Sequence, residues 1–299
     1  MNIVTTRAGY VAIVGRPNVG KSTLMNALIE QKVSITSRKP QTTRHHILGI
    51  KTSSETQILF VDTPGIHSNQ KRAINRYMNR AAQSVIADVD VTVMLVDRHV
   101  FTADDEMILE RIQKSGCQLI LAINKVDRVK QQQEILPIIA ALKERVGDQH
   151  IVPISASRKE NLDGLERVIE SLLPVSPFYF PPEEVTDRSE KFLVAELIRE
   201  KLMRQFGEEL PYATTIQLER FEAQSKVIQI DATIFVERTG QRATLIGAGG
   251  NKLKRVGIDA RKDIEKLVDH QVMLRLWVKV KRGWSDDERA LRSLGYGED

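Results

Sequence analysis

The chain has 299 residues, which is enough for two domains, and 44 Lys and Arg against 39 Asp and Glu give it a net charge of +5. Its single cysteine, Cys117, excludes an intrachain disulfide and a cysteine-based metal cluster. No apolar run approaches the ~18 to 20 residues of a membrane span, and the first ten residues lack a signal-peptide pattern, so we expect a cytoplasmic protein. Peripheral attachment to the inner membrane stays open.

Short apolar runs alternate with helix-period segments through residue 173. The runs are rich in β-branched residues and apolar on both faces, which is typical of strands in a buried, mostly parallel sheet with helical crossovers. This pattern predicts an α/β domain over residues 1–175. The expected strands are Tyr10–Val14, Ile58–Val61, Val91–Val96, Leu119–Ile123 and Ile151–Ile154.

Clustered prolines in "LPVSPFYFPPEEVTDRS", residues 173–189, cannot sustain a helix or a central strand, so residues 176–189 are expected to link two domains. The segments that follow predict a smaller α+β domain of order α-β-β-α-α-β over 190–282, with a C-terminal tail over 283–299. Its expected elements are a helix over Glu190–Phe206, strands over Ala213–Phe221 and Val227–Glu237, helical turns over Gln241–Ile246, a helix after Gly250 and a strand over Val272–Val280.

The first glycine loop, "GRPNVGKS", fits the phosphate-binding pattern G-x-x-x-x-G-K-[ST]. It stands between the apolar strand ending at Val14 and a helix beginning near Lys21, where backbone N–H groups and a helix N-terminus can hold phosphate. In such a loop Lys21 reaches the β and γ phosphates and Ser22 binds Mg²⁺. A chance glycine turn is the alternative. The candidate nucleotide-binding residues here are Gly15, Arg16, Pro17, Asn18, Val19, Gly20, Lys21, Ser22 and Thr23.

The tetrapeptide "NKVD", Asn124 to Asp127, follows the fourth expected strand and indicates which base is bound. An aspartate can accept two hydrogen bonds from the N1–H and 2-amino groups of guanine, and adenine offers neither donor. Asp127 is the candidate for that role, Lys125 would lay its aliphatic stem over the base, and Asn124 would tie the loop together. Alone, the tetrapeptide would more often be a solvated loop. Ser155 and Ala156 follow the last strand, where a backbone N–H could meet the guanine O6.

The stretch "FVDTPGIH" supplies candidates for the metal ion and the terminal phosphate. Asp62 follows an apolar strand and can hold a Mg²⁺-bound water, and the Gly65 amide can bond the γ-phosphate. Thr63 and Pro64 lie between them in the same nucleotide-binding stretch.

The stretch "QTTRHH" contains Thr42 and Thr43, one of which we expect to reach Mg²⁺ when a triphosphate is bound. Thr43 is preferred, although a surface turn is the ordinary explanation of two adjacent threonines. The expected Mg²⁺ ligands are then Ser22, Thr43 and Asp62, and the residues expected to act in hydrolysis are Asn18, Lys21, Thr43 and Gly65.

In their order, "GRPNVGKST", "QTTR", "DTPG", "NKVD" and "SA" resemble the Era family of translation-factor-like GTPases, and "WVKVKRGWSDDERALRSLGY" extends the resemblance over essentially the whole chain. The resemblance implies a P-loop GTPase domain that binds GTP and GDP with Mg²⁺, followed by a KH domain of the second type. It further implies binding near the 3′ end of 16S ribosomal RNA and a role in 30S subunit assembly. We expect a monomer.

Many GTPases place a glutamine directly after the glycine of the DTPG stretch to orient the attacking water, and here that position holds Ile66, which cannot hydrogen-bond water. This resembles the subclass with a hydrophobic replacement at that position. In that subclass the position of Asn18 is associated with a potassium ion near the β and γ phosphates. The resemblance therefore implies slow intrinsic hydrolysis that K⁺, the bound RNA or a ribosomal partner stimulates.

The second glycine loop, "GAGGNKLKR", lacks the Lys-[ST] of the first and resembles the GxxG loop of a KH domain, which grips about four nucleotides of single-stranded RNA. It lies in a basic segment, residues 245–282, with ten Lys and Arg against four Asp and Glu. Family members usually carry a basic residue between the outer glycines, whereas this chain has Ala248 and Gly249. A helix-starting turn with a solvated basic face is the alternative. The candidate RNA-binding residues are Gly247, Ala248, Gly249, Gly250, Lys252, Lys254 and Arg255.

Three functions remain open from the sequence. The chain is an RNA-binding GTPase switch in small-subunit assembly, or a GTPase whose C-terminal domain docks a protein, or a passive RNA-binding module that the nucleotide domain regulates. The basic segment and the second glycine loop favour the first and third. Of the two tryptophans, Trp277 is expected to pack against other residues, and Trp284 either stacks on a base or covers the edge of the domain.

Overall fold

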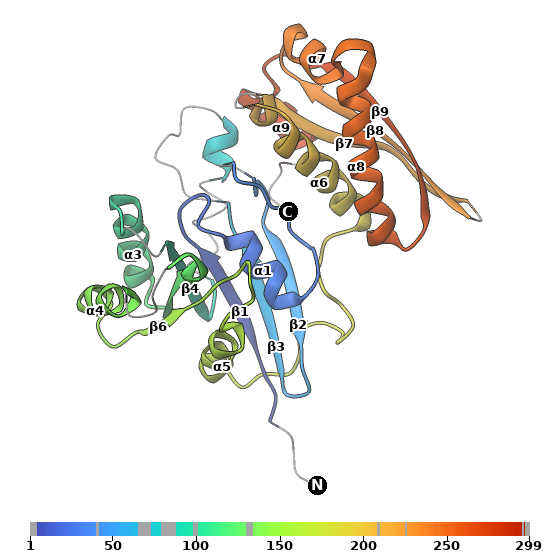
Figure 1. Cartoon of the computed structure of the whole chain (residues 1–299). Helices are drawn as coiled ribbons and strands as arrows, with labels where there is room; N and C mark the ends of the chain where they lie inside the picture. The colour runs from blue at the N-terminus through green and yellow to red at the C-terminus, as the bar shows by residue number, and fades with distance from the viewer. Residues whose placement is uncertain are drawn as a thin grey trace. The chain divides into compact units, whose positions relative to one another are not determined.

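The computed structural model describes residues 5–39, 42–64, 73–78, 88–97, 101–129, 134–207, 210–224, 226–294 and 296. The chain divides into two compact units (Figure 1). The first consists of Met1–Ser34, Thr43–Ser68 and Met78–Asp187. The second consists of Arg188–Asp299 together with two short segments from the N-terminal half, Ile35–Thr42 and Asn69–Tyr77.

The first unit contains a six-stranded sheet with the order β2-β3-β1-β4-β5-β6. All of its neighbouring strands run parallel except β2, which pairs antiparallel with β3. The predicted α/β class with a mostly parallel sheet is therefore confirmed. The strands are β1 (Arg7–Val14), β2 (Ile47–Thr52), β3 (Thr56–Asp62), β4 (Val91–Asp97), β5 (Gln118–Asn124) and β6 (His150–Pro153).

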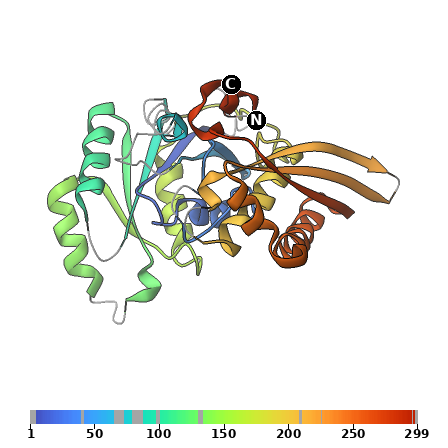
Figure 2. The ribbon, with the colours of Figure 1, turned by 90° about the horizontal axis from the view of Figure 1, so that it is seen from above.

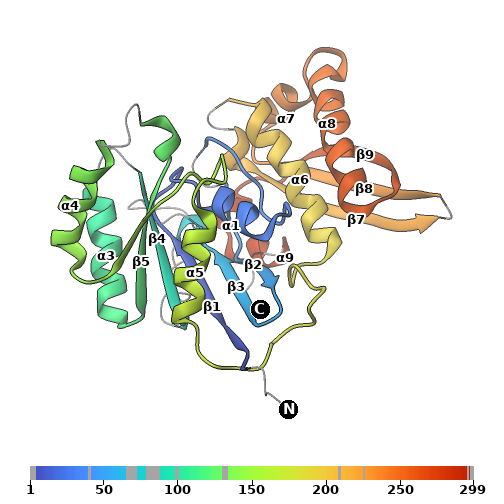
Figure 3. The same cartoon turned by 60° about the horizontal axis from the view of Figure 1, so that its bottom comes forward.

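Helices cover both faces of this sheet. The side chains of α3 (Ala103–Ser115) and α4 (Ile135–Val146) share a buried apolar core with alternate residues of β1, β4 and β5. Figure 3 shows α1 (Lys21–Ile29) and α5 (Leu162–Leu172) together on the other face. This arrangement leaves the carboxyl ends of the parallel strands, where β1 leads into α1, available for ligand.

The edge strand β2 was not predicted from the sequence. Half of its six residues are partly exposed, and they include a lysine and a glycine, so it lacks the long apolar run that marks the parallel strands. Gly49 permits close packing, because a Cβ at this position would lie 2.0 Å from Cδ1 of Ile29 in α1. A polar, antiparallel edge strand carries a weaker sequence signal than a buried parallel one.

The proline-rich stretch after α5 is bonded along the sheet of the first unit. Near its start, the amide of Ala8 donates to the carbonyl oxygen of Pro174 at 3.3 Å. Near its end, Ile50 N–H donates to Val185 O at 2.9 Å and Thr186 Oγ1 donates to Leu48 O at 2.6 Å. Because its prolines prevent a helix, this stretch bonds instead to residues of β1 and β2. These hydrogen bonds hold it against the sheet.

The second unit has the order α-β-β-α-α-β that the sequence predicted, followed by a 3-10 turn, η5 (Trp284–Asp286), and a short helix, α9 (Glu288–Ser293). Its three-stranded sheet has the order β7-β8-β9, and the long hairpin of β7 and β8 can be followed in orange in Figure 2. Helices α6 and α8 pack on one face of the sheet. The main elements are α6 (Glu190–Gln205), β7 (Thr214–Gln224), β8 (Val227–Val236), α7 (Thr239–Ile246), α8 (Asn251–Val268) and β9 (Gln271–Val280).

Trp277 lies outside the core, and its side chain is 43% exposed. Successive strand residues point to opposite faces, and Leu276 takes the core-facing position on β9. Trp284 is fully buried and packs in a cluster of the second unit with Ala73, Ile74, Leu291 and Tyr296. Across the described residues, no helix is long and apolar enough to cross a membrane.

Candidate nucleotide and RNA sites

The first glycine loop has a backbone that only glycine adopts readily. Gly15 and Gly20 have φ angles of 148° and 110°, and a Cβ on Gly15 would lie 2.6 Å from the carbonyl oxygen of Leu95. The loop leads into α1 at Lys21, and no side chain caps this helix N-terminus. Its backbone N–H groups can therefore donate to an anion.

Lys21 lies over the loop and is buried. Its Nζ donates to the carbonyl oxygens of Gly15 at 3.0 Å and Arg16 at 3.3 Å. Burial lowers the pKa of Lys21 to about 8, against the opposing attraction of Asp62. Among the described residues, the Lys21 ammonium donates its hydrogen bonds to carbonyl oxygens, so this buried charge is well placed to bind a phosphate.

Three hydroxyl groups converge on one carboxylate oxygen at the end of β3. Oδ2 of Asp62 accepts from Ser22 Oγ at 2.6 Å, Ser34 Oγ at 2.8 Å and Thr43 Oγ1 at 3.2 Å, and the Ser22 and Thr43 hydroxyls are 2.9 Å apart. Burial raises the pKa of Asp62, against these hydrogen bonds and the charge of Lys21. Ser34 was not among the predicted residues, and no motif in the sequence marks it.

The group around Asp62 fits a divalent cation. The other carboxylate oxygen, Oδ1, is buried and accepts no hydrogen bond from any described residue. Carboxylate and hydroxyl oxygens are ligands that Mg²⁺ prefers. The three predicted metal ligands, Ser22, Thr43 and Asp62, are therefore brought together beside Lys21.

Asn124 joins three loops at the carboxyl end of the sheet. Its Nδ2 donates to Val19 O at 2.7 Å, and its Oδ1 accepts from the backbone N–H groups of Lys125 at 2.8 Å and Ala156 at 3.0 Å. A Cβ on Gly20 would lie 2.4 Å from this Nδ2. The side chain thus fixes the NKVD stretch against the first glycine loop.

The carboxylate of Asp127 is held by Ser155, whose Oγ donates to Oδ1 at 2.7 Å. Lys125 is extended across the loop, and its Nζ donates to Asn18 O at 3.0 Å and Asp97 Oδ2 at 2.7 Å. Asp97 was not predicted, although its position at the end of β4, directly after an apolar strand, was a usable signal.

The remaining predicted residues of this site have mixed environments. Arg16 forms an ion pair with Asp105 of α3 at 3.1 Å, which directs its side chain towards that helix. Thr63 Oγ1 donates to Ile13 O at 3.1 Å, and Thr42 Oγ1 donates to Lys39 O at 2.7 Å. Pro17 and Thr23 are half-buried, and Pro64 is buried. Gly65 and Ile66 lie outside the described residues.

The second glycine loop is exposed and bends sharply between α7 and α8. Gly247, Gly249 and Gly250 have φ angles of 73°, 58° and 77°, and the Gly250 amide donates to Gly247 O at 3.2 Å. Helix α8 begins directly afterwards with no side-chain cap. The Asn251 N–H donates to Ala248 O, and the N–H groups that follow at the start of α8 point towards the loop, a geometry suited to phosphate. Three exposed cations stand on the first turns of α8: Lys252, Lys254 and Arg255.

Two family models match the chain. A model described as a 50S ribosome-binding GTPase matches residues 10–125, which contain the first glycine loop and the beginning of "NKVD". A KH domain model matches residues 209–285, which contain the second glycine loop.

Full-length relatives define the family more narrowly. The chain is 55% identical to GTPase Era of Pseudomonas fluorescens (strain Pf0-1) and 54% identical to GTPase Era of Pseudomonas aeruginosa (strain LESB58). These alignments cover 98% of this chain and 98% and 96% of the two relatives. The chain belongs to the Era family of GTPases.

Two solved Era structures have the same fold. An Era bound to MgGDPNP and nucleotides 1506–1542 of 16S ribosomal RNA matches with a TM-score of 0.95 and 36% identity, over 98% of this chain and all of that one. Aquifex aeolicus Era, in a variant bound to GDP and AlF4⁻, matches with a TM-score of 0.95, 35% identity and the same coverage. The Era fold therefore extends through both units of this chain.

Proposed function

We propose that this chain is a GTP-hydrolysing switch that binds 16S ribosomal RNA near its 3′ end and assists assembly of the 30S subunit. The main support for this proposal is that the first glycine loop, the NKVD stretch and the residues around Asp62 lie together at the carboxyl end of the first sheet. There Asn124 joins the phosphate-binding loop to the base-reading stretch, and Asp62 gathers the candidate metal ligands. The second unit adds an exposed glycine loop with a basic helix.

In the phosphate half of the site, Lys21 would bind the β and γ phosphates together with the N–H groups at the start of α1. Ser22 and Thr43 would be ligands of Mg²⁺, and Asp62 would hold it through water. The ion would neutralise phosphate charge as the terminal phosphoryl group is transferred to water. In the nucleotide-bound protein the three hydroxyl bonds to Asp62 would be exchanged for bonds to the ion and its waters.

In the base half of the site, Asp127 would accept hydrogen bonds from guanine, with Ser155 fixing the orientation of its carboxylate. Lys125 would lie along one face of the base, and the Ala156 loop would approach O6. Because Ile66 cannot orient water, we infer that hydrolysis is slow without a stimulant. Asn18 would bind K⁺ near the phosphates, and Gly65 would bond the γ-phosphate through its amide.

In the second unit, residues 247–250 would grip single-stranded RNA through the backbone, with Lys252, Lys254 and Arg255 contacting phosphates. An Era relative has a solved structure with nucleotides 1506–1542 of 16S ribosomal RNA, and the similarity over the whole chain supports the same ligand class here. We infer a monomer that acts on the 30S subunit in the cytoplasm, and cell fractionation tests for peripheral attachment to the inner membrane.

The test is fluorescence anisotropy of a labelled RNA that carries the 16S 3′ sequence, with a GTP analogue and with GDP at one fixed salt concentration. We expect sequence-dependent binding whose affinity differs between the two nucleotides. Weak binding that ignores both RNA sequence and nucleotide would overturn the RNA-switch proposal and favour a protein-docking role for the second unit.

A further inference from the structure

The segment Ile35–Thr42 belongs to the second unit, although it lies between two residues of the nucleotide site. Ser34, directly before it, and Thr43, directly after it, both donate to Oδ2 of Asp62. The two ends of this eight-residue segment are therefore fixed at the candidate metal site. Contacts made by the residues between Ser34 and Thr43 therefore affect whether Thr43 stays beside Asp62.

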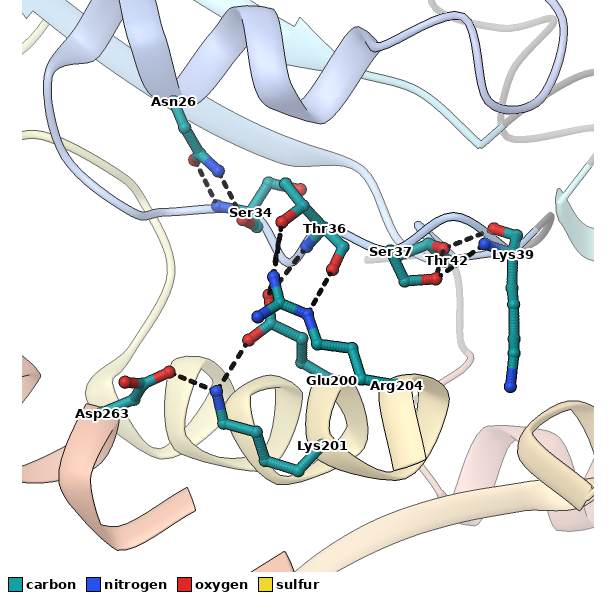
Figure 4. A network of polar contacts seen from close by, with 10 residues as sticks. All are labelled: Asn26, Ser34, Thr36, Ser37, Lys39, Thr42, Glu200, Lys201, Arg204 and Asp263. Atoms are coloured by element: carbon teal, nitrogen blue, oxygen red, sulfur yellow. Dashed lines mark hydrogen bonds and ion pairs between the residues drawn. The ribbon is translucent and has the colours of Figure 1, made fainter. Parts of the chain in front are cut away.

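Two charged side chains of α6 hold Thr36, near the start of the segment (Figure 4). Oε1 of Glu200 accepts from the Thr36 backbone N–H at 3.0 Å. Arg204 donates from Nε to Thr36 O at 3.1 Å and from Nη2 to Thr36 Oγ1 at 2.9 Å. The same Nη2 is 2.9 Å from Oε1 of Glu200. All the polar groups of Thr36 are thus engaged by one turn of α6.

A third side chain of α6 holds the other end of the segment. Arg199 is buried, and its Nη2 donates to the carbonyl oxygen of Thr42, which is one peptide bond from Thr43. Its Nε donates to Oε1 of Glu196 at 2.7 Å, an interaction that fixes the plane of the guanidinium. A guanidinium oriented in this way restricts the position of the Thr42 carbonyl.

Burying the charged side chains that make these contacts costs free energy, because the charges lose their hydration. Glu200 is completely buried, and Oε2, the oxygen that does not face Thr36, accepts from Lys201 at 3.1 Å. Lys201 also bonds Asp263 of α8, the helix that begins at the second glycine loop (Figure 4). Well-packed apolar residues can often replace a buried ion pair without loss of stability. Packing alone therefore does not explain why Glu200, Lys201 and Asp263 are charged.

We propose that Arg199, Glu200 and Arg204 are positioning residues for the GTP-bound state of the nucleotide site. They hold Thr36 and Thr42 so that Thr43 remains beside Ser22 and Asp62, where it would bind the metal ion. The inference rests on the proposed function, in which Thr43 contacts Mg²⁺ only when a triphosphate is present. Releasing the segment lowers the fraction of molecules ready for a triphosphate and leaves diphosphate binding unchanged, because GDP does not need Thr43.

The test uses the full chain and measures dissociation constants for a fluorescent GTP analogue and for fluorescent GDP, both with Mg²⁺. The variants are Arg204→Ala, which removes an exposed side chain with little risk to folding, and Glu200→Gln, which keeps the shape and removes the charge. Lys191→Ala, an exposed cation on the first turn of α6, is the matched control. Thermal unfolding of each variant checks that the fold is intact.

We expect Arg204→Ala and Glu200→Gln to weaken analogue binding by about 5-fold or more, which is the lower range of measured coupling between sites. GDP affinity should stay within about 2-fold, and Lys191→Ala should change neither constant. A residue with only a structural role would lower both affinities together or the unfolding temperature alone.

The possible outcomes separate this inference from the proposed function. If the wild-type chain binds neither guanine nucleotide, or prefers ATP, the proposed function fails. If the wild type binds both nucleotides and the variants keep its ratio of analogue to GDP affinity, the proposed function stands and the positioning role is wrong.

Discussion

Asp127 is the residue on which nucleotide specificity should depend. Its carboxylate is oriented by Ser155 and can accept two hydrogen bonds from guanine. We expect Asp127→Asn to weaken GTP binding by about 100-fold or more, because the new amide presents a donor to the 2-amino group. Xanthosine triphosphate, which has a carbonyl there, should bind the variant better than GTP does. Competition binding measures both, and Asp148→Asn at an exposed site is the control.

The proposed binding of K⁺ near the phosphates depends on a single residue, Asn18. Its carbonyl is held by Lys125, and its φ of 64° is a conformation that asparagine tolerates better than most residues. We expect GTP turnover in K⁺ to exceed turnover in Na⁺ by on the order of 10-fold, since a cation at the phosphates stabilises charge that develops during transfer. Phosphate release at equal ionic strength measures this, and equal rates in the two salts would remove K⁺ from the mechanism.

The second glycine loop offers a prediction at the scale of an element. Ala248 is exposed between the outer glycines, and its backbone does not need glycine. We expect Ala248→Lys to tighten RNA binding a few-fold and to steepen its dependence on log salt concentration by about one unit, because one more phosphate contact forms. Anisotropy titrations at several salt concentrations measure both. An unchanged salt slope would mean that the loop does not face the RNA backbone.

Sequence reasoning succeeded where an element has a strong local pattern. Four of the parallel strands, β1, β3, β4 and β5, are almost entirely buried, and the motif of each glycine loop lies within a few consecutive residues. It missed β2, whose edge position leaves only a weak alternation, and it did not show that Trp284 rather than Trp277 lies in the core, because strand alternation does not reveal which face a helix will cover. Contacts such as Thr36 with Glu200, 164 residues apart, have no local signature at all.

At the scale of the whole molecule, the C-terminal residues stabilise the second unit. Trp284 is fully buried against Ala73 and Ile74, and its Nε1 donates to Ala213 O at 3.3 Å. We expect Trp284→Ala to cost about 3–5 kcal/mol of unfolding free energy, because a large cavity is left behind. Trp277→Ala, at an exposed position, should cost much less. Denaturant unfolding compares the two, and equal losses would contradict the packing described for Trp284.

Nucleotide and RNA binding should also be linked reciprocally across the molecule. If the GTP analogue changes RNA affinity by some factor relative to GDP, the RNA must change the preference for the analogue over GDP by the same factor. Titrating nucleotide with and without saturating RNA measures the second factor independently. Unequal factors would show that a further equilibrium, such as self-association, accompanies binding.

The division of the chain into units also has a consequence for folding during synthesis. Ala73 donates its amide to Asp286, 213 residues later, and Thr36 must wait for α6. The sheet of the first unit can therefore form while two of its intervening segments still lack their partners, since domains generally fold as they emerge. Until residues 284–296 are made, Ala73 and Ile74 present apolar surface to the solvent, and a nascent chain stalled before that point should recruit chaperones through this segment.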